Sequence, residues 1–423
     1  MSKFIIKGGQ PLKGTVRVGG SKNAALPIMC AGLLCQEKVV LKNVPEISDV
    51  ESMRKIFHTL NVKTRWLEKN TLEIDPTEVA FAPISHSLVS RMRASILLLG
   101  PLLARFGKVR LAFPGGCVLG KRSLFAHIES LEQMKATVGR SHDDLILKGR
   151  LKAGMVVMPE MSVTATENVI MAAVLTKGKT HIHLAACEPH VQDLCRFLNS
   201  RGARIDGVGS HCLIVDGVKK LSGGEYEVIS DYLEAGTLAL AAVLTRGEVT
   251  IKNIHRHDLD FFFYKLKEAG GRFSFTKGTG TQGQNLIIKP AKRLYAVDVK
   301  TAVHPGFPTD LQAPFAVLLT QAEGLSEIFE TLFEDRLNYL FELEKMGAKF
   351  AFINAHQAKV FGRIRLIGAS IASCDIRAGA AMVIAALVAE GETEISNILY
   401  IDRGYENLEK KLRELGADIR RMK

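Results

Sequence analysis

The chain has 423 residues, of which 47% are hydrophobic and 24% are charged. This globular composition allows two or three domains and excludes intrinsic disorder as the main state. Lys and Arg number 56 against 44 Asp and Glu, and the resulting net charge of +12 favours an anionic partner.

The longest apolar runs lie near residues 95–104 and 380–389. Both fall short of the ~18 residues that a membrane-spanning helix needs. The first residues also lack the apolar region of a signal peptide. These observations predict a soluble, cytosolic protein.

In chain order, six segments repeat one pattern. Each has a polar start, an Ala/Leu-rich stretch of helix length, a turn and then β-branched residues, which predicts a helix followed by a strand. The segments begin at Ser21, Ser90, Val163, Asp231, Thr309 and Cys374.

A second, amphipathic stretch follows each segment and ends in a short turn, such as residues 60–62 or 415–417. Equivalent positions recur every ~70 residues, the signature of an internal repeat. Alternating residues then predict strands, for example a hairpin over 203–215. The first helix of each unit is nearly all apolar and should be buried, whereas the second should face water on one side.

Six such units exceed one hydrophobic core, so two groups of three, divided near Ser230, are the natural arrangement. The strand-like segments 4–6 and 16–18 fit either half. The sequence therefore predicts a two-domain α/β protein.

Charged residues stand where the buried helices begin. Asp231 and Asp375 fit as helix caps, the interpretation that we favour for each. Lys22, Arg91 and Arg93 are cations at the helix end where positive charge is unfavourable. Their presence predicts an anion bound between them.

Residues 113–122 (FPGGCVLGKR) form a glycine-rich loop that carries Cys117. Lys121 and Arg122 should lower the pKa of this thiol, as in reactive cysteines, although an idle surface cysteine is the alternative. His127 lies ten positions later, and only geometry decides whether the two residues pair.

Residues 304–308 (HPGFP) lead rigidly into the helix start that carries Asp310. Asp310 is either a helix cap or, if Thr309 caps the helix instead, a candidate general base.

The other six cysteines lie in apolar or strand-like runs and should pack in the core, without a disulfide framework or a Cys-rich zinc site. The pairs 181/183 and 255/257 are alternating histidines with no third ligand nearby, so we expect neither a metal nor a cofactor. The basic residues are dispersed, which argues against nucleic-acid binding.

The sequence resembles the enolpyruvyl transferase family, to which EPSP synthase belongs, along essentially its whole length. Six motifs carry the resemblance: SKNAALP at 21–27, MRAS at 92–95, PGGC at 114–117, FPTDLQ at 307–312, DIRA at 375–378 and IDRGYE at 401–406. The resemblance implies two inside-out α/β-prism domains of three repeated β/α units each. They would comprise residues 22–229, and residues 1–21 with 230–423.

The resemblance further implies transfer of the enolpyruvyl group of phosphoenolpyruvate to the 3′-hydroxyl of UDP-N-acetylglucosamine, with release of phosphate. This reaction is the first committed step of peptidoglycan synthesis and thus serves cell-wall biogenesis, cell shape and division. Cys117 would protonate the methylene carbon and be the target of fosfomycin, while Asp310 would accept the hydroxyl proton. Lys22, Arg122 and Arg403 would hold phosphoenolpyruvate. The remaining substrate contacts implied are Asn23, Arg93, Ser123, Leu124, Phe125, Ala126, Ser162, Val163, Leu332, Asp375 and Arg377.

Departures from the family pattern gather on the nucleotide side. Phe125 stands near the position of the usual aspartate, Glu160 replaces a lysine and Thr164 a glycine. The reaction type is therefore better supported than the acceptor. Two alternatives stay open: transfer to another nucleotide or a shikimate-like acceptor, and a catalytically idle paralogue that binds a nucleotide sugar. The sequence leaves the oligomeric state open.

Overall fold

The computed structural model describes residues 2–422 except 91, 113–123, 142–143 and 279–282. Within these residues the chain forms two compact units, each with its own hydrophobic core. The first unit comprises the described residues between 20 and 229. The second unit comprises residues 2–19 and 230–422. In the described part of the chain, no helix has the length and apolarity to cross a membrane.

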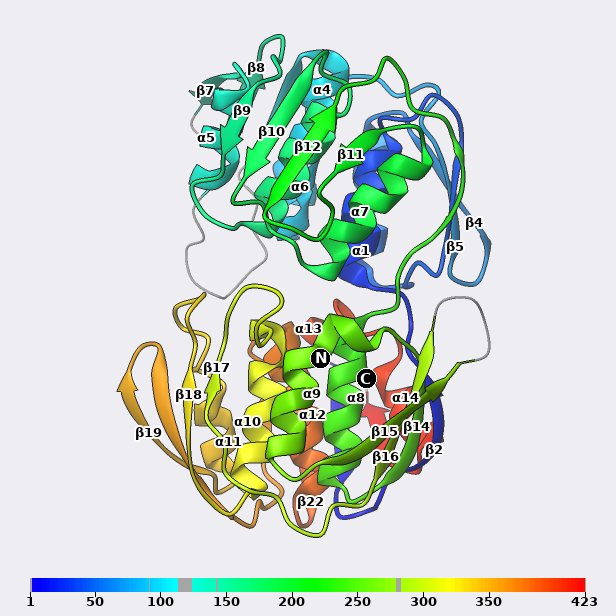
Figure 1. The fold of residues 1–423 in the computed structure, drawn as a ribbon. Coiled ribbons are helices and arrows are strands. Elements are labelled where there is room, and N and C mark those ends of the chain that lie inside the picture. The colour runs from blue at the N-terminus through cyan, green and yellow to red at the C-terminus, as the bar shows by residue number, and fades with distance from the viewer. Residues whose placement is uncertain (1, 91, 113–123, 142–143, 279–282, 423) are drawn as a thin grey trace. The chain divides into compact units, whose positions relative to one another are not determined.

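Three helices that contact one another fill the second unit: α8 (Tyr232–Leu244), α10 (Gln312–Gln321) and α12 (Ile376–Val388). Nearly all of their residues are buried, as predicted for the first helix of each repeat. Sheets lie around this bundle (Figure 1). The strands of the second unit are β1 (Lys3–Lys7), β2 (Lys13–Arg17), β14 (Glu248–Ile254), β15 (Arg272–Lys277), β16 (Gln284–Lys289), β17 (Val299–Lys300), β18 (Gly324–Phe329), β19 (Lys349–Asn354), β20 (Gln357–Gly362), β21 (Ser370–Ala372), β22 (Glu392–Ser396) and β23 (Asp418–Met422).

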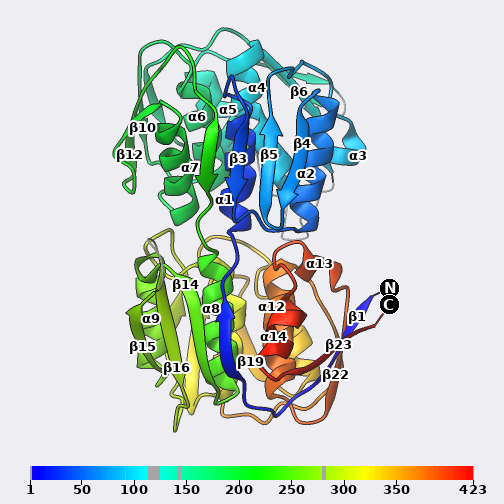
Figure 2. The same ribbon diagram turned by 90° about the vertical axis from the view of Figure 1, so that its right-hand side faces the viewer.

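These strands make three four-stranded sheets, in the orders β21-β22-β1-β23, β15-β16-β14-β2 and β17-β18-β20-β19. The two N-terminal strands belong to different sheets (Figure 2). Strand β1 is antiparallel to both β22 and β23, whereas β2 runs parallel to β14. Both predicted N-terminal strands therefore exist, but they do not pair with each other.

Glycines in two central helices of the second unit let neighbouring side chains approach closely. A Cβ atom added to Gly236 of α8 would lie 2.5 Å from the side chain of Leu311. One added to Gly379 of α12 would lie 2.6 Å from Ile401. Both distances are far below ordinary van der Waals contact, so the Ala/Gly-rich sequences are needed for packing as well as for helix formation.

The first unit repeats this plan. Its buried helices are α1 (Lys22–Gly32), α4 (Leu99–Phe106), which continues the 3-10 helix η1 (Arg93–Leu98), and α6 (Val163–Ala173). Its sheet orders are β13-β3-β5-β4, β11-β12-β10-β9 and β6-β8-β7. The strands are β3 (Val39–Lys42), β4 (Lys63–Glu68), β5 (Thr71–Asp75), β6 (Lys108–Ala112), β7 (Thr137–Ser141), β8 (Asp144–Lys148), β9 (Met155–Val157), β10 (Lys179–His183), β11 (Arg204–Asp206), β12 (Cys212–Asp216) and β13 (Gly224–Glu227).

The second helix of every repeat ends in the same turn. These helices are α2 (Ser48–Thr59), α5 (Phe125–Gln133), α7 (Pro189–Ser200), α9 (Asp260–Glu268), α11 (Leu340–Lys345) and α14 (Leu408–Glu414). Shortly after each, one residue has a positive φ, and the next backbone N–H bonds to a carbonyl five residues earlier, which is the Schellman motif. The residues with positive φ are Asn61, Lys135, Gly202, Gly270, Gly347 and Gly416. The six predicted repeats and the fold class are confirmed.

The remaining short helices are α3 (His86–Val89), η2 (Arg256–Leu259), η3 (Thr309–Leu311) and α13 (Leu399–Asp402). Of these, η3 and α13 carry or adjoin residues singled out by the sequence. Helix η3 runs directly into α10, and Arg403 is the C-cap residue of α13.

Candidate active site

Asp310 lies between two buried arginines in the second unit. One carboxylate oxygen accepts a hydrogen bond from Arg336 Nη2 at 2.5 Å, and the other accepts one from Arg377 Nε at 3.0 Å. The arginine side chains are 4% and 5% exposed, and Asp310 is 26% exposed. Burial raises the pKa of Asp310, but the charges of Arg377 and Arg336 outweigh it and hold the pKa well below its usual range. Asp310 is therefore an ionised, partly accessible carboxylate.

The turn before α10 does not use the predicted caps. Pro308 occupies the cap position, and the Thr309 hydroxyl donates to Glu330 at 2.7 Å, so the alternative in which Thr309 caps the helix is wrong. Asp310 does not cap it either, because its two oxygens face the arginines. The sequence alone indicated only that the rigid segment 304–308 leads to the helix start at Asp310.

Hydrogen bonds to Glu330 hold this turn in place. It is fully buried, and it accepts hydrogen bonds from the hydroxyls of Thr309 and Thr301 and, at 3.0 Å, from the backbone N–H of Leu332. A buried carboxylate with several donors is well satisfied, which makes the segment rigid. Leu332 itself is 37% exposed at the surface of the unit.

Asp231 and Asp375 are helix caps, as the simpler interpretation held. Asp231 Oδ1 accepts from the backbone N–H of Leu233 at 2.8 Å at the start of α8. Asp375 Oδ1 accepts from the backbone N–H groups of Arg377 and Ala378 at 2.7 and 2.9 Å. The Asp375 cap therefore helps to position Arg377, which donates a hydrogen bond to Asp310.

Arg377 is also covered by an aromatic ring. Its guanidinium carbon lies 5.2 Å from the centroid of Tyr405, within cation–π range. The Tyr405 hydroxyl is 3.0 Å from the Thr237 hydroxyl of α8. Arg403 lies two positions before Tyr405, so the motif 401–406 supplies both a cation and the cover for Arg377.

In the first unit, Lys22 is the first residue of α1, next to Asn23, and Ser21 caps the helix. The Lys22 ammonium lies 3.4 Å from Asp49 Oδ2, and the two side chains are 12% and 5% exposed. A bound anion is therefore not needed to explain this cation, since a buried carboxylate of α2 already offsets part of its charge. The spacing of 27 residues gave no sequence signal for that pair.

His127 of α5 is held between elements that also carry predicted site residues. Its Nδ1 lies 3.0 Å from the Asn168 amide nitrogen, and its Nε2 lies 3.1 Å from the Thr164 hydroxyl. Asn168 Oδ1 accepts from Gly100, so its nitrogen is the donor and the ring proton is assigned to Nε2. Burial and the charge of Arg93 lower the pKa of His127 to about 3. His127 is thus a neutral link between α5 and α6.

The nucleotide-side candidates gather at the starts of α5 and α6, which contact each other. Phe125 is the first residue of α5 and is 60% exposed, whereas Ala126 is buried. Ser162 occupies the cap position of α6 without a side-chain cap bond. The described members of this group are Leu124, Phe125, Ala126, Ser162 and Val163.

Several candidates lie outside the described residues: Arg91, Cys117, Arg122 and Ser123. Among the described residues, the sequence alone identifies Asp310 and Arg377 but not Arg336 and Glu330, and it places Tyr405 in the motif 401–406 without a role. The last three contribute through contacts with residues distant in the chain, which a single sequence does not reveal.

Four of the other cysteines are buried, as predicted: Cys30, Cys35, Cys187 and Cys195. Burial raises the pKa of Cys35 and Cys195 to about 12, so these thiols stay protonated. Cys374 is half-buried. The prediction is wrong for Cys212, which is exposed because it lies on the outward face of β12 beside His183.

In the described part of the chain, no group of three or more His, Cys, Asp or Glu residues is arranged to hold a metal ion.

Comparison with known proteins gives a consistent result. The UDP-N-acetylglucosamine 1-carboxyvinyltransferase of Idiomarina loihiensis is 45% identical over 425 residues, covering 100% of both chains. Proteins of the same name from Coxiella burnetii and Methylacidiphilum infernorum are 43% and 41% identical, covering 100% of this chain and 96% and 99% of theirs.

Among solved structures, the enolpyruvyl transferase NikO from Streptomyces tendae has a TM-score of 0.89 and 25% identity, covering 100% of this chain and 99% of its own. EPSP synthase from Acinetobacter baumannii has a TM-score of 0.79 at 16% identity over 100% of both chains, which indicates a shared fold. Residues 6–412 match the family EPSP synthase (3-phosphoshikimate 1-carboxyvinyltransferase). The chain belongs to this family and is an enolpyruvyl (1-carboxyvinyl) transferase.

Proposed function

We propose that the protein transfers the enolpyruvyl group of phosphoenolpyruvate to the 3′-hydroxyl of UDP-N-acetylglucosamine, releasing phosphate in the first committed step of peptidoglycan synthesis. The observation that carries this proposal is the 41–45% identity to full-length relatives of that name. The ionised, partly accessible Asp310 supports it, because the acceptor hydroxyl must lose a proton.

In the proposed reaction, Cys117 donates a proton to C3 of phosphoenolpyruvate, which makes C2 electrophilic. The acceptor oxygen bonds to C2 while its proton passes to Asp310. A proton then passes from C3 back to the Cys117 thiolate while the C2–O bond to phosphate breaks, which restores the double bond and the thiol. Lys22, Arg122 and Arg403 hold the anionic groups of the donor, and their positive charge stabilises the departing phosphate.

Asp310 is a weak base while both arginines bond to it, because their charges lower its pKa. A proton acceptor works best when its pKa lies near the working pH. We therefore propose that the anionic substrates draw hydrogen bonds of Arg336 or Arg377 away from Asp310, which raises its pKa when the acceptor hydroxyl is present. Asp375 acts by capping α12 and fixing Arg377.

The acceptor-binding residues are proposed to be Asn23, Arg93, Leu124, Phe125, Ala126, Ser162 and Val163, with Ser123 and Leu332. Phe125 offers an exposed ring and Glu160 an exposed carboxylate on this side. These two residues favour, as a second candidate, transfer to another nucleotide. An aromatic face stacks on any base, and a carboxylate accepts hydrogen bonds from amino or imino groups.

One measurement separates the candidates. Phosphate release from phosphoenolpyruvate is followed with UDP-N-acetylglucosamine, with shikimate 3-phosphate and with other uridine, cytidine and adenosine nucleotide sugars. The proposal expects turnover to be fastest with UDP-N-acetylglucosamine. Preference for another acceptor establishes the second candidate, and no phosphate release with any of them identifies an idle paralogue.

We also propose that the two units correspond to enolpyruvyl transferase domains of residues 22–229, and of 1–21 with 230–423, and that the enzyme acts in the cytoplasm. Its partners are small-molecule substrates, and no nucleic acid or cofactor takes part.

A further inference from the structure

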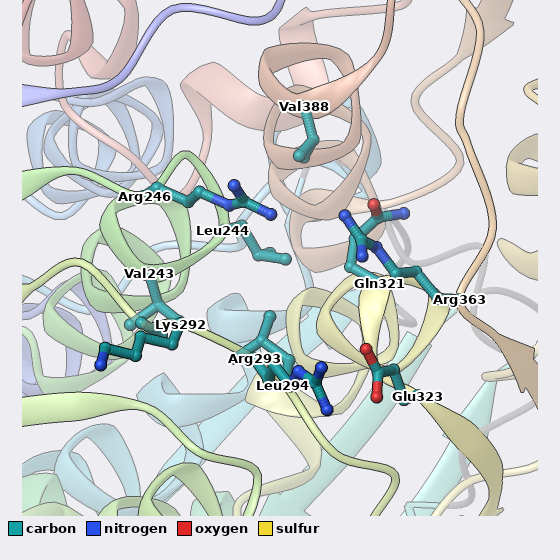
Figure 3. A pocket seen from close by; sticks show the side chains of 11 residues that line it. Val243, Leu244, Arg246, Lys292, Arg293, Leu294, Gln321, Glu323, Arg363 and Val388 are labelled. Carbon is teal, nitrogen blue, oxygen red and sulfur yellow. The ribbon is translucent and has the colours of Figure 1, made fainter.

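A cavity of about 160 Å³ lies in the second unit where α8, α10 and α12 end. Its wall includes Leu244, Gln321 and Val388, which are the last residues of these helices (Figure 3). Asp231, Asp310 and Asp375 lie at or just before the opposite ends. A helix of 10–13 residues is about 15–20 Å long, so this helix-end pocket is separate from the candidate active site.

The lining of the helix-end pocket is strongly cationic. Arg246, Lys292, Arg293 and Arg363 contribute positive charge, and Glu323 is the single carboxylate among the lining residues. The cations come from segments far apart in the sequence: the turn after α8, the stretch between β16 and β17, and the turn after β20. The fold thus gathers like charges that repel one another at this place.

The pocket arginines also differ from other arginines of the same unit. Arg336, Arg377 and Arg421 bond to carboxylates at 2.5–3.0 Å. For Arg246 and Arg363, by contrast, the described residues provide no hydrogen bond or ion pair to the guanidinium group. Arg293 is in the same situation. Each guanidinium therefore keeps five N–H donors for water or a ligand.

Compensation of the helix ends does not account for these cations. One carbonyl near the end of each helix already accepts a backbone N–H group from beyond the helix: Ala242 from Gly247, Thr320 from Ile364 and Leu387 from Gly9, at 2.8–2.9 Å. Three helix C-termini add about −1.5 charges, and one carboxylate adds about −1, against about +4 from the cations. The excess is about +1.5. In Figure 3 the Lys292 side chain points away from the other cations, and without it the excess is still about +0.5.

We infer that the helix-end pocket binds a small phosphate-bearing anion, either inorganic phosphate or the phosphate group of a monoester. Planar guanidinium groups match phosphate oxygens with paired, charge-assisted hydrogen bonds. A cavity of about 150 Å³ holds a ligand the size of benzene, so this pocket accepts one phosphate group with a few further atoms but not a whole nucleotide. The inference does not depend on the acceptor substrate or on the activity.

The test is calorimetric titration of the full chain with inorganic phosphate, with glycerol 3-phosphate and with glycerol as the neutral control. The double variant Arg246→Gln/Arg363→Gln removes two pocket cations. The double variant Arg17→Gln/Arg420→Gln makes the same charge change at exposed positions of the same unit, outside the pocket. Phosphate bound at the active site stays in both variants and appears as a separate, unchanged binding event.

The inference predicts a binding event that weakens about 10-fold or more in the pocket variant and is unchanged in the matched variant, the scale of lost charge-assisted hydrogen bonds. Tighter binding of glycerol 3-phosphate than of phosphate identifies the monoester as the source, and the reverse identifies the free ion. Equal phosphate binding by all three proteins, equal loss in both variants, or no binding of either anion at millimolar concentration overturns the inference.

Glu323→Gln gives an independent test, because the expected result is tighter binding and a misfolded variant would bind more weakly. Removal of this carboxylate increases the positive excess in the pocket, so phosphate should bind a few-fold more tightly. Weaker or unchanged binding in a variant that melts at the wild-type temperature also overturns the inference.

Discussion

The two units build the same helix starts from different side chains. In the second unit, Asp231 and Asp375 cap their helices, and Asp310 precedes the third. In the first unit, Ser21 caps α1 and Arg93 opens η1. The backbone plan is thus common to both units, while the ionisable groups at the helix starts are mainly acidic in one and basic in the other.

The difference extends to how each charge is supported. Asp310 has two buried cations as partners, so the second unit presents a carboxylate held ionised. In the first unit, the Lys22 ammonium lies 3.4 Å from a carboxylate oxygen of the buried Asp49, a longer contact than either of those to Asp310. The repeats therefore share the backbone geometry on which packing depends, whereas the side chains at the helix starts differ in charge and chemistry.

The largest expected effect concerns the thiol of Cys117, in the first half of the sequence. Fosfomycin should abolish wild-type turnover, whereas Cys117→Asp should keep activity and resist the compound, because a carboxylic acid can donate a proton but is not alkylated as a thiolate is. Residual turnover after preincubation measures this. Cys212→Ser, at the exposed cysteine of β12, is the control and should remain sensitive. Equal inactivation of wild type and Cys117→Asp means that the target is another group.

The acidic side of the comparison is tested at Asp310. Asp310→Ala should lower turnover at least ~100-fold, the usual scale for a lost acid–base group. Asp310→Asn keeps the size of the side chain and should show a similar loss, which separates chemistry from packing. Asp298→Asn, at an exposed carboxylate of the same unit, should have a normal rate. A near-normal rate for Asp310→Ala would assign Asp310 a structural role.

Arg336→Gln tests whether the arginines control the ionisation of Asp310. Because the arginine lowers the pKa of Asp310, its removal should raise that pKa. Less of the carboxylate is then ionised in acid, so the acidic limb of kcat/KM should move to higher pH, while Asp310 stays ionised at neutral pH. The control is Arg365→Gln, at an arginine that is 73% exposed. A pH profile that does not move in Arg336→Gln contradicts the role assigned to this arginine.

The smallest effect tests the feature that the two units share. Lys135 has φ +71° at the position where four repeats have glycine. Lys135→Gly should therefore raise the free energy of unfolding by about 0.5–1 kcal/mol. Gly202→Ala, with φ +102° and no atom within 4 Å of the added carbon, should lower it by about 1 kcal/mol. Thermal melts measure both, and a less stable Lys135→Gly protein would show that Lys135 makes a compensating contact.

Repeats made most of the fold predictable. The apolar helices, the turns and the strand pattern are local, so their order and type could be predicted, including the hairpin of β11 and β12. The caps at Asp231 and Asp375 followed from residue type and position for the same reason. Neither alternative for the cap of the next helix was right: Asp310 faces two arginines, and the Thr309 hydroxyl bonds to Glu330. That contact joins residues 21 positions apart, and only tertiary packing determines it.

The candidate site was predictable only in part. Asp310 stood out because of the rigid segment before it, and Arg377 because of the family motif. Arg336, in contrast, lies 26 residues after Asp310, in a turn without periodic pattern. Burial of Cys212 was wrongly predicted because its neighbours Leu213 and Val215 are buried, but alternation along β12 turns Cys212 outward. Long-range partners and strand facing are the information that one sequence lacks.

The position of β1 between β22 and β23 has a consequence for biosynthesis. Phe4 pairs with Ile395 and Arg421, so the backbone groups of β1 have no strand partners until almost 400 further residues have been synthesised. At roughly 5–20 residues per second, a ribosome needs on the order of 20–80 s to supply them. The first unit is continuous in the chain and can fold during that interval. The N-terminal strand meanwhile needs protection from pairing with other nascent chains.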